Sequence, residues 1–216
     1  MAITIGNKTA SNANPSGSTQ TLSHNMNVGA DGTLLVVITM PSTVSFNSVT
    51  YDGVAMTLVR NQLFSGLSQR QGTYILQAPS TGSNNIVVSF TGSQFNGTSI
   101  FAQSFTGAGG LDVEANNGAS TSPNSQSLTI QANSIIYTTG ISDNAQSFGY
   151  DIGGSTRTNE FAHNTNKQVE GALSATGLLA GSQNVTTKAD AGTVTNYRIA
   201  ILEAGTIITR RRIIIC

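Results

Sequence analysis

The sequence predicts an all-β protein, a two-sheet antiparallel sandwich of the jelly-roll type with a short C-terminal extension. Charged residues make up only 9% of the 216-residue chain, whereas a soluble domain usually has about a quarter. Gly, Ser, Thr and Asn take their place, and the polar ones among them compete with helical hydrogen bonds rather than support an exposed helix. Short apolar segments also alternate with turn-forming clusters along the chain, a spacing typical of β-sandwiches.

Two segments carry the strongest strand signals. Residues 32–40 (GTLLVVITM) are almost continuously apolar, which predicts a central strand covered on both faces. In residues 46–60 the pair Asp52-Gly53 lies between two arms of high strand propensity, and it predicts a type I′ hairpin turn with φ above zero at both positions. Further strands are expected at residues 72–78, 85–91, 99–106, 127–131, 134–141, 183–188 and 197–204.

Three segments depart from this strand pattern. Residues 171–180 (GALSATGLLA) are the only helix candidate, and the internal Gly177 weakens it. Residues 116–126 predict a polar connection that crosses between sheets. Residues 146–169 are long and polar, and a loop of that length is typically functional or mobile. We take this stretch as a variable contact surface, with the candidate contact residues Arg157, Glu160, His163 and Lys167.

Two pairs of segments suggest an internal repeat. Residues 33–37 resemble 134–138, and residues 82–87 resemble 181–186, at offsets of 101 and 99. Residues 82–87 are followed by a strand that is expected to end at Gly107, and residues 181–186 by one that is expected to end at Gly205. The offset between these two glycines is 98. Two similar halves explain these matches, and chance similarity between short β patterns is the alternative.

The bulk composition favours one sandwich domain over residues 1–205, followed by an arm over residues 206–216. Apolar residues make up 38% of the chain and never form a run long enough to span a membrane. The start has no basic segment followed by an apolar one, so no signal peptide is expected. The net charge is zero, which disfavours nucleic-acid binding because neutralising phosphates requires an excess of Lys and Arg. The one cysteine, Cys216, allows no disulfide within the chain.

No motif predicts a catalytic residue, a metal site or a cofactor. Residues 112–118 resemble the start of a calcium loop, but the glycine is one place late and Pro123 stands where a bidentate Glu is required. Residues 107–110 are rich in glycine but lack the Lys-Ser/Thr ending of a phosphate loop. Two histidines, His24 and His163, are too few for a zinc site built on histidine. We expect ordinary turns at both glycine-containing segments and no enzymatic activity.

The C-terminal arm is the most unusual local feature. It combines three consecutive arginines with three consecutive isoleucines, which cannot all point inward from one strand because side chains alternate between faces. One interpretation is an arm that adds to a neighbour's sheet or fills its groove, with the arginines facing an acidic surface; the other is a frayed end. The candidate partner-contact residues are Ile207, Ile208, Arg210, Arg211, Arg212, Ile213, Ile214 and Ile215.

Three stretches resemble a family of bacteriophage and bacterial β-sandwich proteins. They are SVTYDGVAMTLVR (48–60), GTYILQAPSTGSNNIVVSF (72–90) and SIFAQSFTGAGGLD (99–112), and the resemblance extends over residues 32–205. The chain departs from the family in having Met56 where leucine is usual and no tryptophan in the strand around Tyr74. The shared motifs mark positions in the fold rather than a site.

The resemblance implies a virion component. We expect a capsid decoration or cement subunit that is assembled in the host cytoplasm, forms a homo-oligomer such as a trimer, and contacts the major capsid protein or another virion protein. Many copies would stabilise a capsid lattice through repeated weak contacts. The alternative is a tail-fibre or adhesin domain that binds host-surface glycan, and a sandwich glycosidase ranks last because no acid/base pair is visible. We expect neither nucleic acid nor membrane as a partner.

Overall fold

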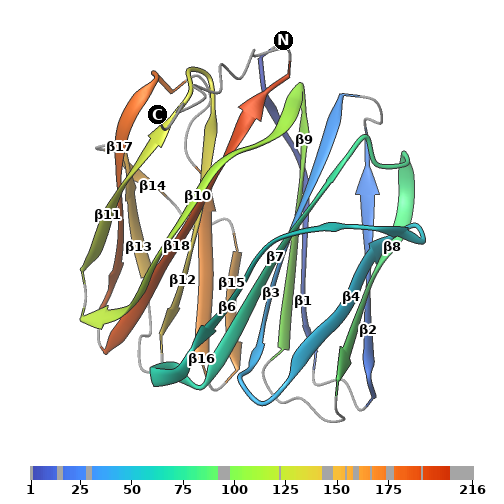
Figure 1. The fold of residues 1–216 in the computed structure, drawn as a ribbon, viewed down its shortest axis with the longest axis horizontal. Helices are drawn as coiled ribbons and strands as arrows, with labels where there is room; N and C mark the ends of the chain where they lie inside the picture. The colour runs from blue at the N-terminus through green and yellow to red at the C-terminus, as the bar shows by residue number, and fades with distance from the viewer. Residues whose placement is uncertain are drawn as a thin grey trace, which may run out of the picture.

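Four antiparallel β-sheets make up the protein in the computed structural model (Figure 1). It describes residues 2–13, 17–27, 31–91, 98–121, 123–142, 148–153, 155–157, 161–165, 167–173, 178–190 and 192–204. Within these ranges every regular element is a strand except one 3₁₀ turn, η1 (Ser65–Leu67). The predicted all-β antiparallel sandwich class is therefore confirmed, but there are four sheets instead of the expected two. The described residues include no helix long and apolar enough to cross a membrane.

The first half of the chain forms sheets A and B. Sheet A has the strand order β1-β9-β3-β7-β6, and sheet B has the order β2-β8-β4-β5. The strands are β1 (Thr4–Ala13), β2 (Thr19–Met26), β3 (Gly32–Pro41), β4 (Ser45–Tyr51), β5 (Val54–Ala55), β6 (Thr57–Phe64), β7 (Gln69–Gln77), β8 (Gly82–Thr91) and β9 (Thr98–Thr106).

The second half forms sheets C and D. Sheet C has the order β10-β18-β12-β16-β15, and sheet D has the order β11-β17-β13-β14. The strands are β10 (Ala108–Thr121), β11 (Asn124–Ile130), β12 (Ile135–Ser142), β13 (Phe148–Ile152), β14 (Ser155–Arg157), β15 (Phe161–Thr165), β16 (Lys167–Leu173), β17 (Gly181–Ala189) and β18 (Thr193–Glu203).

The four sheets lie in the layer order B, A, C, D (Figure 1). One apolar cluster fills the space between sheets A and B, and a smaller one lies between sheets C and D. A third cluster joins sheet A to sheet C, where the rings of Phe101 and Tyr137 stack with centroids 5.3 Å apart. Sheet A is therefore covered on both faces, which confirms the expectation for residues 32–40. Leu34 and Val36 face sheet B, whereas Leu35 and Val37 face sheet C.

The two halves have the same strand order. Adding nine to each strand number in sheets A and B gives the strand order of sheets C and D. For example, β3 lies in the middle of sheet A and β12 in the middle of sheet C. Glycines of positive φ begin the equivalent strands β8 and β17, at Gly82 (φ 91°) and Gly181 (φ 121°). The internal repeat is therefore confirmed, and the offset of 99 is in register because Ile86 and Val185 both point into a sandwich interior.

The other sequence match is out of register by one residue. An offset of 101 aligns Leu35, which faces the seam between sheets A and C, with Ile136, which faces sheet D. A shift by one residue along a strand exchanges its two faces. Because β3 and β12 are buried on both faces, neither strand alternates between apolar and polar residues, and their sequences do not distinguish one register from the next.

The chain passes from the first half to the second through the single residue Gly107, between β9 and β10. Its φ of 68° turns the backbone, and its amide donates a hydrogen bond to the carbonyl of Asp31 at 2.8 Å. The carbonyl of Gly107 accepts from the amide of Ala204 at 2.7 Å. Gly107 is thus a turn at a strand end, as expected. Residues 108–110 and the calcium-like segment 112–118, which were also expected to form turns, lie instead within β10.

The predicted hairpin is present. Asp52 and Gly53 have φ values of 50° and 75°, and Tyr51 pairs directly with Val54 across a two-residue turn. Positive φ at both central positions is the property that favours Asp-Gly here.

Three segments expected to be irregular or helical contain strands instead. Residues 146–169, expected to be a long loop, contain β13, β14, β15 and the start of β16. The helix candidate at 171–180 begins within β16. Residues 116–126, expected to be a crossover, belong mostly to β10 and β11. The strands of the two polar segments, 116–126 and 146–169, lie in the outer sheet D or at the sides of sheet C. Antiparallel strands in such positions can keep one face polar.

Candidate functional site

The described residues provide no cluster of metal-binding side chains. No three His, Cys, Asp or Glu residues among them could hold a metal ion. Asp112, the first residue of the calcium-like segment, accepts hydrogen bonds from the amide of Gln131 at 2.8 Å and the hydroxyl of Ser134 at 3.0 Å. Glu114, the next acid, pairs with Arg60. Both acids therefore have structural partners.

The four residues of the predicted contact loop are not gathered into one loop. Arg157 belongs to β14 in sheet D, where it pairs with Tyr150. His163 and Lys167 belong to the paired strands β15 and β16 at the edge of sheet C. Glu160 lies outside the described residues, as do the arm residues 206–216 with their eight candidate contacts.

One buried cation lies inside the second sandwich. Arg198 in β18 is fully buried, and its Nη1 donates to the carbonyl of Asn196 at 3.0 Å. Burial lowers its pKa to about 10. The side chain of Asn196 in turn donates to the carbonyls of Asn124 and Val185. The first sandwich also buries polar side chains, Gln20 and His24, but beside a larger apolar cluster.

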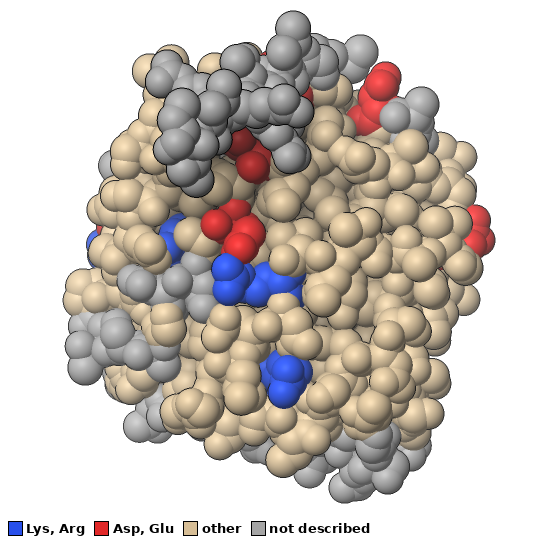
Figure 2. All heavy atoms as spheres, viewed as in Figure 1, with Lys and Arg blue, Asp and Glu red and all other residues tan. Residues whose placement is uncertain are grey.

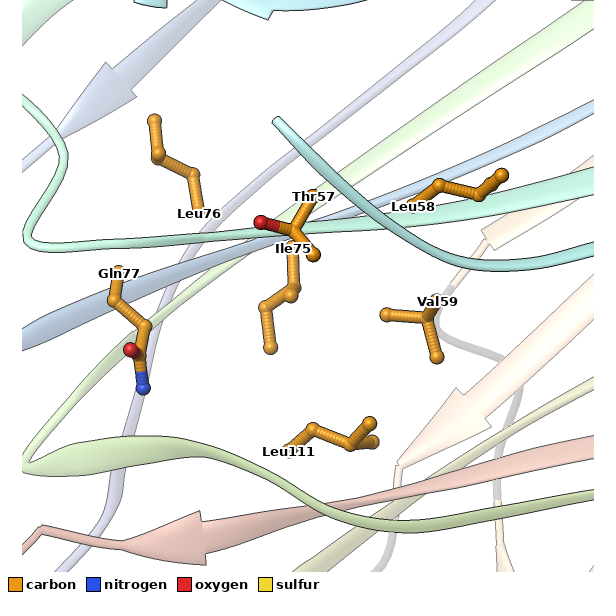
Figure 3. A pocket seen from close by; sticks show the side chains of 7 residues that line it. All are labelled: Thr57, Leu58, Val59, Ile75, Leu76, Gln77 and Leu111. Carbon is orange, nitrogen blue, oxygen red and sulfur yellow. The ribbon is translucent and has the colours of Figure 1, made fainter. Parts of the chain in front are cut away.

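A hollow opens at the edge of sheets A and C, between β6, β7 and β10. Its volume is about 480 Å³, and its lining is largely aliphatic. In Figure 3 the side chains of Ile75, Val59 and Leu111 occupy the space between the β6–β7 pair and β10, and Gln77 extends toward β10. The lining residues are Thr57, Leu58, Val59, Ile75, Leu76, Gln77 and Leu111.

Polar ties between the two sandwiches lie on either side of this hollow along β10. On one side Arg60 of β6 forms a bidentate ion pair with Glu114, with Nε and Nη2 each 2.6 Å from a carboxylate oxygen. Hydrogen bonding to this carboxylate raises the pKa of Arg60. On the other side the amide of Gln77 donates to the carbonyl of Gly109. The two ties hold sheet A to sheet C while the aliphatic side chains between them remain open.

Glycine makes the second tie possible. Gly110 has φ of 107°, and a Cβ there would clash with the Nε2 atom of Gln77. A Cβ on the neighbouring Gly109 would lie 3.1 Å from the carbonyl oxygen of Glu203. The glycine-rich start of β10 thus serves close approach of three strands rather than phosphate binding.

A second hollow, of about 290 Å³, opens on the other face of sheet A, toward sheet B. Its lining includes Met56, Val49 and the edge-to-face pair of Phe46 and Tyr74, whose centroids are 5.7 Å apart. Leu58 of β6 lines both hollows and is 49% exposed. Strand β6 pairs only with β7 among the described residues, so no described strand lies against its other edge, which runs beside two apolar hollows.

Charged side chains are sparse over this face of the molecule. Figure 2 shows that most of the face seen in Figure 1 carries neither acidic nor basic side chains, with a small mixed group near its centre. Such a surface, with an open strand edge and aliphatic hollows, is suited to binding an extended protein segment by strand addition.

Sequence reasoning missed this site. The sequence predicts residues 57–60 as a hairpin arm, and the pattern of β6 does not show that it is an edge strand. Whether a strand lies at an edge depends on which strands pair over long range. Leu58 and Leu63 are exposed in the structure, but in the sequence they are ordinary apolar residues of a strand and do not mark an edge. No protein-family model matches the chain, and no curated protein matches it.

Proposed function

We propose that this chain is a non-enzymatic virion structural protein, a capsid decoration or cement subunit that stabilises a capsid lattice through repeated weak contacts. The observation that carries the proposal is the strand order, which occurs twice. In each half, the order 1-9-3-7 in one sheet faces 2-8-4-5 in the other. Consecutive strands from β1 to β4, and again from β7 to β9, alternate between the two sheets. This arrangement supports assignment to the jelly-roll class, which is common in viral capsid proteins.

The sequence resemblance to phage and bacterial β-sandwich proteins points in the same direction. Its motifs fall on the hairpin of β4 and β5, on β7 and β8, and on β9 with its exit at Gly107. These are positions that set the fold. The major capsid protein or another virion protein would be the partner, and the site of action would be the virion assembled in the host cytoplasm.

The surface also supports a structural role. A subunit that acts by repetition needs only weak contacts at each lattice position, because linked contacts strengthen one another. Neutral hydroxyl and amide side chains can form such contacts without the strong salt dependence of charged surfaces.

Glycan binding by a tail-fibre or adhesin domain is less well supported. Sugar sites commonly use exposed aromatic rings as stacking platforms. The chain has no tryptophan, and all five tyrosines are buried: Tyr51, Tyr74, Tyr137, Tyr150 and Tyr197. A glycan site in the described residues would therefore lack its usual platform.

The test is reconstitution on particles from the genome that encodes this chain. Particles made without the gene should release their nucleic acid at lower temperature than complete particles, and adding purified protein should restore the release temperature in a saturable manner. Bovine serum albumin at equal concentration is the control. No binding to the deficient particles, together with saturable binding on a glycan array, would favour the adhesin alternative.

A further inference from the structure

We propose that the edge of β6 receives the C-terminal arm, residues 206–216, of a second copy of this chain, so that two copies exchange arms. The inference deepens the proposed structural role, on which it rests, by naming a partner for the arm and the surface that receives it. It concerns contacts between copies in solution, and its test needs no virus particle.

The two hollows explain why the arm needs consecutive isoleucines. A strand added to the free edge of β6 extends sheet A, and its side chains alternate between the two faces of that sheet. One face leads to the hollow lined by Val59, Ile75 and Leu111, and the other to the hollow lined by Met56 and Phe46. Three consecutive isoleucines on an ordinary edge strand would leave at least one in water. Here both faces offer apolar surface.

The described part of the chain ends beside the first hollow. The end of β18 pairs with the start of β10, with Glu203 opposite Ala108 and Ile201 opposite Leu111, which lines the hollow. The chain therefore leaves the described region at Ala204, close to the hollow of its own copy. A two-fold axis near this rim would bring each arm to the other copy's hollow, and such an exchange closes on itself.

The length of the arm is sufficient. Eleven extended residues span about 36 Å at about 3.3 Å per residue. Strand β6 has eight residues, or about 26 Å on the same basis. The arm can therefore pair along β6 and still provide several residues to cross between copies.

Net charge favours attraction between the arm and the body of a second copy, and on β6 itself the charge of Arg60 is paired with Glu114. The arm holds three of the ten Lys and Arg residues and none of the ten Asp and Glu residues. The remaining chain has seven cationic and ten acidic residues, a net charge of −3. The arm of one copy is thus attracted to the body of another, and salt should weaken that attraction.

The first test measures oligomeric state by native mass spectrometry. The full chain should be dimeric, and a chain ending at Gly205 should be monomeric with an unchanged sheet spectrum in circular dichroism. Leu58→Glu should also give monomer, because the charge would lie between the two hollows. The matched control is Leu179→Glu, since Leu179 is 80% exposed and distant in sequence from β6. A monomeric full chain, or a truncated chain that still dimerises, would overturn the inference.

The second test locates the arm and does not depend on a disruptive substitution. Cys216 is the only cysteine, so one added cysteine on β6 can form a disulfide with it wherever the arm lies in register. Mixing isotopically heavy and light protein before mild oxidation separates links between copies from links within one. The exchange is supported if any added cysteine on β6 forms more heavy–light disulfide with Cys216 than the Leu179→Cys control does. It is contradicted if only light–light and heavy–heavy disulfides form, or if none forms. The added cysteines are Thr57→Cys, Leu58→Cys, Asn61→Cys and Leu63→Cys.

The two proposals can fail separately. If the arm does not link copies while the protein still restores deficient particles, the arm exchange is wrong and the subunit binds the capsid by another surface. If arms exchange but the protein neither binds nor is found on particles, the virion role is wrong and the dimer remains.

Discussion

At the scale of single residues, His24 is the clearest titratable group in the first sandwich. It is 1% exposed in β2, and its Nδ1 lies 3.0 Å from the hydroxyl of Thr9. Burial lowers its pKa from 6.5 to about 4. The folded protein therefore holds His24 neutral at pH values where the unfolded chain would bind a proton.

This difference predicts acid sensitivity. Between about pH 6.5 and pH 4 the unfolded chain binds a proton at His24 and the folded protein does not. The free energy of unfolding therefore falls as the pH falls through this range. Between pH 7 and 4.5 the wild type should lose about 2 kcal/mol more free energy of unfolding than His24→Gln, since each pKa unit corresponds to about 1.4 kcal/mol. Urea unfolding at the two pH values measures this. Equal losses in both proteins would show that His24 does not titrate as expected.

The ion pair of Arg60 and Glu114 is a second residue-scale feature. Its side chains are 33% and 20% exposed, compared with 52% and 28% for the pair of Lys188 and Asp151. Partial burial and bidentate geometry strengthen a pair. A double-mutant cycle with Arg60→Met and Glu114→Gln should give a coupling of about 1 kcal/mol, and the cycle at Lys188 and Asp151 a smaller one. The reverse order would mean that the tie does not hold the sandwiches together.

At the scale of elements, turn conformation decides the effect of substituting glycine. Gly53 has φ of 75°, and a Cβ at this position would have no atom within 4 Å; Gly66 in η1 has equally open space without positive φ. Gly53→Ala should therefore cost about 1 kcal/mol through backbone strain alone. Gly66→Ala should be neutral or slightly stabilising. Thermal unfolding of the two variants measures the difference, and equal melting temperatures would contradict the turn assignment.

The elements also show what the sequence could and could not predict. Strands β3, β8, β9 and β18 are predictable because their apolar residues are dense. Strand β2 escapes prediction because its buried face alternates Gln20 and His24 with Leu22 and Met26, which weakens the apolar pattern. The number of sheets and the open edge at β6 depend on long-range pairing, for which a single sequence has no local signal.

At the scale of the whole molecule, the two sandwiches share one buried seam. Phe101 and Phe105 of sheet A pack with Tyr137 and Ile199 of sheet C, and the connection between halves is one residue long. Neither sandwich can separate from the other without exposing this surface to water. We therefore expect the halves to unfold together.

Phe101→Ala tests this coupling. Removing the ring should destabilise the protein by about 3–5 kcal/mol, the usual range for a buried phenylalanine. Hydrogen exchange should report the same loss of protection in β8 of sheet B and in β17 of sheet D, at opposite ends of the four layers. If β17 keeps its protection while β8 loses it, the sandwiches unfold independently.

We propose above that this protein is a repeated structural component of a virion. The most direct measurement is the number of copies per purified particle, obtained by quantitative mass spectrometry against the major capsid protein of the same particles. A decoration or cement subunit should be present in a fixed, high ratio to the major capsid protein that is constant between preparations and across density-gradient fractions. Absence from the particles, or only a few copies per particle, would contradict the account.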